Sequence, residues 1–265
     1  MCQGATARVG WSLCLAFLGA CLSPAPDALA IVDEIQVYTD DLDARGESGL
    51  ELHINTTPSG RSTPDYPGDI PPYHGVRITP EFSWGLGHDL DWGLYLPTTT
   101  DSDGHFYFGG AKLRVKWLPV RAAEGGSGWY AGINNELSDL NKSFSDSRWN
   151  DEVRFIGGYR GTDWLIGVNP ILEWGLSPGF RGSPDFTLAW KAMVDVARGF
   201  SLGAEYYQDY GPLSNPLPRD EQNRTLYAVM EIERKAWTLN FGVGRGLTPA
   251  TDDWTVKAIV GIAFN

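Results

Sequence analysis

The feature that most constrains the fold is an alternation of apolar and polar residues, repeated in about twelve separate segments. In the last segment, Trp254, Val256, Ala258, Val260, Ile262 and Phe264 share one face. A strict period of two is typical of a strand whose faces lie in different environments. The twelve segments lie near residues 50–55, 76–84, 90–96, 111–117, 129–138, 151–160, 164–174, 186–196, 201–209, 226–233, 237–244 and 254–264. Since none has helical periodicity, the chain is predicted to be all-β.

The links between these segments alternate in length. The long links fall at 58–75, 98–105, 139–150, 178–185, 211–224 and 247–253. The shorter links fall at 87–89, 119–128, 161–163, 198–199 and 235–236. In an up-and-down antiparallel meander, this pattern places all long loops on one rim and all short turns on the other.

The direction of the apolar face separates two kinds of all-β protein. A soluble sandwich or lipocalin-like barrel turns its apolar face inward, whereas a membrane barrel turns it towards lipid. The segments run about 9–11 residues, the length that crosses a bilayer when tilted. Aromatic residues also sit near the ends of the apolar faces, as in an aromatic girdle: Trp84, Trp92, Trp117, Trp164, Trp174, Trp237, Trp254 and Phe264. We therefore predict a transmembrane β-barrel of about 12 strands over residues 49–265, with the soluble β protein as the alternative.

The N-terminal region has the pattern of an export signal. Arg8 precedes an apolar run over residues 9–22, and Ala28-Leu29-Ala30 matches a small-x-small cleavage site. We predict that residues 1–30 are a cleaved signal peptide. A lipid on Cys21 is the alternative, because the sequence before Cys21 also resembles a lipoprotein box. The acidic segment 31–48 is predicted either to stay periplasmic or to enter the barrel as a plug.

Composition and motifs exclude several functions. The net charge of −12 argues against a nucleic-acid partner, since phosphate contacts need clustered Lys and Arg. The four histidines show no metal-ligand spacing, and the three cysteines all lie within residues 1–30, so we predict no metal site and no cofactor. Residues 100–104 match only part of a calcium loop and are interpreted as a polar turn. The chain has no Gly-x-Ser-x-Gly motif, so we predict no catalytic residues.

The polar face carries the candidate lumen residues. They are Glu51, His53, Arg77, Glu81, Asp91, Lys112, Arg114, Lys116, Glu136, Arg154, Glu173, Lys191, Glu205, Glu231 and Lys257. Opposed charges can select and orient polar solutes in a narrow pore; the alternative is a set of salt bridges that simply fills the lumen. Lys112, Arg114 and Lys116 share one wall, which predicts a modest bias towards anions.

The export signal, the even number of amphipathic strands, the alternating loops and the aromatic last strand resemble those of bacterial outer-membrane β-barrel proteins. The segments Asp33–Tyr38 and Ile54–Gly60 are similar to those of uncharacterised proteobacterial porin-like barrels. The resemblance implies the Gram-negative outer membrane, contact with its lipid and insertion by the barrel-assembly machinery. It implies a porin-like channel for small polar solutes, with a closed structural or interaction barrel, or a lipid-modifying enzyme, as alternatives.

Overall fold

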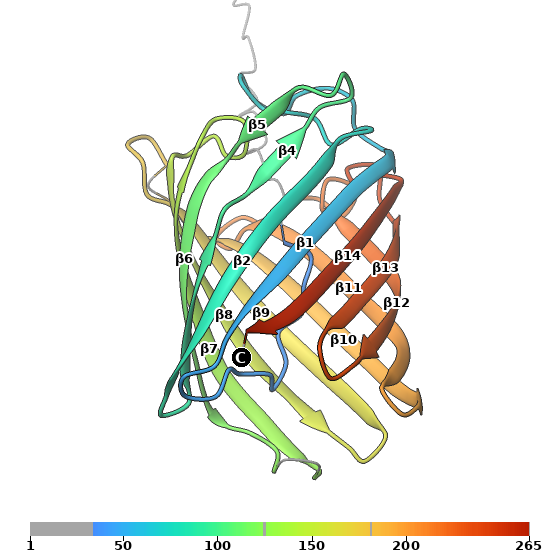
Figure 1. Cartoon of the computed structure of the whole chain (residues 1–265). Coiled ribbons are helices and arrows are strands. Elements are labelled where there is room, and N and C mark those ends of the chain that lie inside the picture. Colours follow the sequence, from blue (N-terminus) through green and yellow to red (C-terminus); the bar gives the residue numbers. More distant parts are fainter. Residues whose placement is uncertain (1–33, 124–125, 181, 265) are drawn as a thin grey trace, which may run out of the picture.

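All strands of the computed structural model join into one antiparallel sheet that closes on itself (Figure 1). The structure describes residues 34–123, 126–180 and 182–264. The strands are β1 (Ser48–Ser59), β2 (Val76–Gly87), β3 (Leu90–Tyr95), β4 (Thr98–Thr100), β5 (Phe106–Phe108), β6 (Gly110–Val120), β7 (Gly128–Leu140), β8 (Trp149–Arg160), β9 (Trp164–Gly175), β10 (Asp185–Ala197), β11 (Phe200–Pro212), β12 (Arg224–Glu233), β13 (Thr238–Gly246) and β14 (Trp254–Phe264). Among these residues, no helix is long and apolar enough to span a membrane.

The barrel closes because β1 pairs with both β14 and β2. Ser48 lies opposite Phe264 on one side and Trp84 on the other. Both β3 and β4 pair with β2, so together they form one interrupted barrel strand. On their other side, β6 pairs with β3 and β5 pairs with β4, so β5 and β6 form a second interrupted strand. The predicted twelve-stranded up-and-down barrel is therefore confirmed.

The predicted loop at 98–105 is wrong in its extent, because β4 and β5 continue the barrel wall and leave only residues 101–105 between them. Pro97 follows β3 and has no N–H to donate to a ladder, so the strand is interrupted there. On the facing strand, Gly110 has φ 122°, a conformation that favours glycine, and breaks the wall between β5 and β6.

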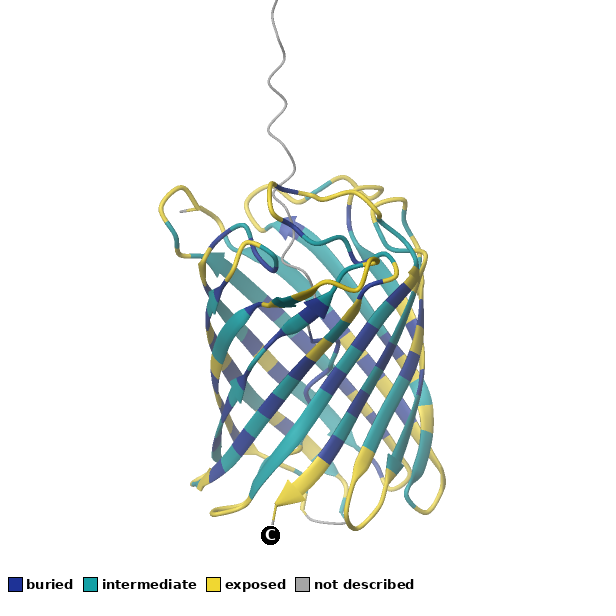
Figure 2. Cartoon of the chain, turned by 45° about the horizontal axis from the view of Figure 1, so that its top comes forward, coloured by how far each residue is buried: buried dark blue, intermediate teal, exposed yellow. Residues whose placement is uncertain are grey.

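The apolar face of the barrel points outward. On β6, Leu113, Val115 and Trp117 are about half exposed, whereas Arg114 and Lys116 are buried. In Figure 2, buried residues alternate with intermediate and exposed ones along the strands in view. An apolar exterior around a polar interior is the arrangement of a barrel in lipid. Closure of the sheet leaves no free edge, so the backbone groups of the strands pair with one another.

The two rims differ in loop length, as predicted. The long loops lie at the top of Figure 1 and the short turns at the bottom, together with the start of β1 and the end of β14. Before β1, the chain from residue 34 contacts inward-facing side chains of the wall. The predicted signal peptide, residues 1–30, lies outside the described residues.

Candidate functional site in the barrel lumen

The N-terminal segment, residues 34–47, is bound to the lumen wall by a paired amide. Asn169 of β9 accepts a hydrogen bond from the backbone N–H of Tyr38 at 2.6 Å and donates one to its carbonyl at 3.0 Å. Asn169 is fully buried, so it satisfies a backbone unit that has no strand partner of its own. The Tyr38 hydroxyl lies 2.7 Å from that of Tyr95 and donates to Glu136 at 3.2 Å.

Further contacts fix the segment at both ends. The Nζ of Lys257 donates to the carbonyl of Ile35 at 2.8 Å, and Arg160 binds both carboxylate oxygens of Asp40 at 2.5 and 2.6 Å. At the lower rim, Gly46 donates to the carbonyl of Gly85 at 3.0 Å. Ile35 and Tyr38 also belong to an apolar cluster inside the barrel. Residues 34–47 therefore lie within the lumen, in contact with the inner face of the barrel.

Predicted lumen residues on β1, β2, β3 and β6 form one ion-pair network. Arg114 donates to Glu81 at 2.6 Å and also pairs with Asp91, which Lys116 approaches to 3.2 Å. His53 lies 3.2 Å from Glu81 through Nε2. Every charge in this network is buried beside a partner of opposite sign, which offsets the cost of taking it out of water.

A second network joins predicted residues of β10, β11, β12 and β14. Lys257 donates to Glu205 at 2.5 Å, although β12 and β13 lie between their strands. Lys191 pairs with Glu231 and lies 3.8 Å from Glu205. Both acids of this network therefore pair with bases from nearby strands.

Other predicted residues lie higher in the lumen. Arg77, Lys112, Glu136, Arg154 and Glu173 line a cavity of about 1400 Å³ beneath the long loops, here called the upper cavity. Glu51 accepts a hydrogen bond of 3.4 Å from Nε2 of Gln36 in the N-terminal segment.

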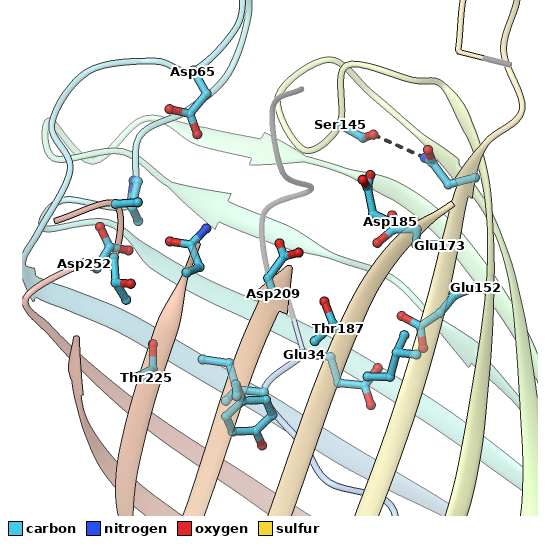
Figure 3. Close-up of a pocket in the computed structure, with 18 of the residues that line it drawn as sticks. Glu34, Asp65, Ser145, Glu152, Glu173, Asp185, Thr187, Asp209, Thr225 and Asp252 are labelled. Atoms are coloured by element: carbon cyan, nitrogen blue, oxygen red, sulfur yellow. Dashed lines mark hydrogen bonds between the residues drawn. The ribbon is translucent and has the colours of Figure 1, made fainter. Parts of the chain in front are cut away.

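Among the residues that the structure describes, twelve carboxylates and four basic side chains line the upper cavity. The bases are Arg61, Arg77, Lys112 and Arg154. Figure 3 shows carboxylates of Glu152, Glu173, Asp185 and Asp209 facing this space, with Glu34 below them. Because carboxylates outnumber bases three to one, the cavity is strongly acidic.

Glu34 lies at the floor of the upper cavity with its charge poorly offset. Its side chain is 3% exposed, neither carboxylate oxygen has a hydrogen-bond partner among the described residues, and Nη1 of Arg154 is 3.9 Å away. Burial raises the pKa of this carboxyl, and the nearby carboxylate of Glu136 raises it further.

Several residues of the site were not identified from the sequence. Tyr38 and Asn169 are uncharged, and the candidate lumen residues were selected from the charged and histidine residues of the polar face. Glu152 and Asp185 do follow the inward alternation of β8 and β10, and that signal could have identified them.

Folding also gathers two groups of possible metal ligands that the sequence spacing did not indicate. Ligand atoms of Glu51, His53 and Glu81 lie within 4.8 Å of one another, as do those of Asp101, Asp103 and His105. The guanidinium of Arg114 is bonded to Glu81, and its positive charge opposes a metal ion at the first group. The second group is a hairpin tip in which Asp101 accepts hydrogen bonds from the backbone N–H groups of Asp103 and His105.

The barrel is similar to solved structures of outer-membrane channels. The COG4313 outer membrane channel from Pseudomonas putida F1 has a TM-score of 0.59 at 12% identity, over 87% of this chain and 100% of its own. The KdgM porin in complex with disordered oligogalacturonate has a TM-score of 0.53 at 10% identity, over 82% of this chain and 99% of its own. No protein-family model and no curated protein sequence matches the chain. The chain thus has the fold of bacterial outer-membrane porin-like barrels.

Proposed function

We propose that the protein is an outer-membrane channel for small polar solutes, with a lumen narrowed by residues 34–47. The observation that carries the proposal is a closed barrel with a lipid-compatible exterior and a charged interior that opens into a large cavity beneath the long loops. Eight strands leave a filled interior and sixteen an open one, so twelve strands suit a constricted path. Signal cleavage after Ala30 and insertion by the barrel-assembly machinery are parts of the same proposal.

The predicted lumen residues divide into two roles under this proposal. Those in the two buried networks hold the wall and the segment in place. Lys112, Arg154 and Glu173 face the upper cavity and act on the solute. Because Arg114 and Lys116 are paired with acids and carboxylates dominate the cavity, we propose a preference for cations in place of the anion bias inferred from the basic wall.

The comparison structures share the fold of this chain, but the solute named with one of them does not by itself indicate the solute of this protein. Oligogalacturonate, named with the KdgM porin, is a polyanion. An upper cavity lined by twelve carboxylates would repel such a chain, so we propose a different solute class here.

A closed barrel without transport is the second candidate, and one observation favours it. The segment makes hydrogen bonds or ion pairs to Asn169, Lys257 and Arg160, which hold it inside the lumen. Transport therefore requires either a path beside the segment or its release.

Swelling of liposomes that contain the purified full chain tests the channel. We expect small neutral sugars to cause swelling and trisaccharides to cause none, since the segment leaves a narrow path. A matched potassium chloride gradient should give a zero-current potential of cation-selective sign. No swelling with any sugar, together with no current, would favour the closed barrel; hydrolysis of the liposome phospholipid would favour the enzyme.

A further inference from the structure

The wall of the upper cavity carries an uninterrupted line of acids. Glu136, Glu152, Glu173 and Asp185 lie on β7, β8, β9 and β10, and each is the direct register partner of the next. We call these four residues the acidic row. Like charges directly opposite each other destabilise a sheet, so four in succession need compensation.

Basic residues of the cavity contact three members of the acidic row. Arg154 donates to Glu152 at 2.9 Å, and Lys112 interacts electrostatically with Glu136 and Glu173. Asp209 adds a fifth carboxylate to the same cavity.

Glu34 is an independent observation that points to a cationic ligand. Its carboxylate is almost fully buried and lines the same cavity, and neither oxygen has a hydrogen-bond partner in residues 34–123, 126–180 and 182–264. A buried charged group without hydrogen bonds is costly unless a ligand completes it. Arg154 contacts Glu34 only at 3.9 Å because the guanidinium is already bonded to Glu152 and to the carbonyl of Gln36.

The spacing of the carboxylates favours an extended ligand over a single metal ion. Neighbouring strands lie about 4.8 Å apart, so the acidic row spans about 14 Å along the wall. Within the part of the chain that the structure describes, the two groups close enough to share one metal ion lie elsewhere. Ile35, Ile171 and Tyr207 also line the cavity and offer apolar surface to methylene groups between charges.

We propose that the acidic row and Glu34 form a binding site for a linear organic amine with two or more ammonium groups, the solute class of the proposed channel. This inference rests on the proposed function for its role in transport, but binding itself can be measured without transport. Ammonium groups would lie against successive carboxylates, and the carbon chain would lie along Ile35, Ile171 and Tyr207.

Calorimetric titration of the full chain in nanodiscs with spermidine tests the site. We expect saturable binding, and we expect Glu173→Gln and Asp185→Asn each to weaken it by about fivefold, as for loss of one solvent-accessible charge contact. Asp103→Asn is the matched control, because Asp103 is an exposed acid at the β4–β5 hairpin tip; it should leave the affinity unchanged.

Two further titrations, with magnesium chloride and with a neutral diol, test whether the site selects an organic amine. Magnesium chloride at equal concentration should bind more weakly than spermidine, and a neutral diol of similar length should not bind. Absence of spermidine binding, equal loss in all three variants, or tighter binding of magnesium would overturn the proposal. Heat-modifiable gel mobility verifies that each variant retains the barrel. Binding without conductance would refute the channel and keep the site, whereas conductance without binding would do the reverse.

Discussion

The Asn169→Leu substitution should release the N-terminal segment while the barrel stays folded. Leucine keeps the branched shape of the asparagine side chain but removes both hydrogen bonds to the backbone of Tyr38, at 2.6 and 3.0 Å. Tyr38 and Asn169 are both buried, so water does not readily replace the lost partners.

The size of the effect follows from those two bonds. Leaving one buried donor or acceptor unsatisfied costs about 1–3 kcal/mol. The N–H and the carbonyl of Tyr38 together give about 2–6 kcal/mol lost from the docked state. Even the lower value makes release of the segment about 30-fold more frequent, since each 1.4 kcal/mol is a factor of ten.

Hydrogen exchange of the peptide that covers residues 34–47 measures this release directly. Its protection should fall at least 30-fold in Asn169→Leu, whereas peptides from the barrel strands keep theirs. Asn135→Leu is the matched control, because Asn135 is also an asparagine of the barrel wall but is exposed on the outer face and donates to Asp151 and to the carbonyl of Glu152. Unchanged protection of residues 34–47 in a folded Asn169→Leu barrel would refute the inference that this amide holds the segment.

Three further predictions concern the wall, the pore and the loops. Val260→Arg should destabilise the barrel in lipid by about 2–4 kcal/mol, since Val260 lies between Leu52 and Leu239 on the outward face. An unchanged free energy of unfolding in a urea titration would argue against lipid contact there. Lys112→Glu should move the zero-current potential further towards cations, and an unchanged potential would remove Lys112 from the conduction path. The hydrogen bond with Asp101 raises the pKa of His105, so this ion pair stabilises the β4–β5 hairpin below about pH 6.5 and is lost as the pH rises through the folded-state pKa. NMR titration should show a lower pKa for His105 in Asp101→Asn, and an unshifted pKa would contradict the pairing.

The barrel could be predicted because its signal is local. Alternation within each strand fixes which residues face lipid, and loop lengths fix the rims, without any knowledge of long-range contacts. The interruption at Pro97 was missed because residues 98–100 and 106–108 are too short for a period of two to stand out.

The interior was harder to predict because its contacts are distant in sequence. Tyr38 and Asn169 are 131 residues apart, and Lys257 reaches Glu205 past two strands. The sequence gives the face on which each charge lies but not how far a lysine extends along the lumen. The acidic row depends on the register between four strands, which the sequence alone did not define.

Single-channel recording in planar bilayers tests most directly whether the protein is a channel whose lumen is narrowed by residues 34–47. The wild-type chain should give small or infrequent cation-selective openings, and Asn169→Leu should give larger or more frequent ones, with Asn135→Leu like the wild type. Silence of all three proteins in bilayers that accept a known porin would contradict the channel. Identical large openings in all three would contradict the role of the segment.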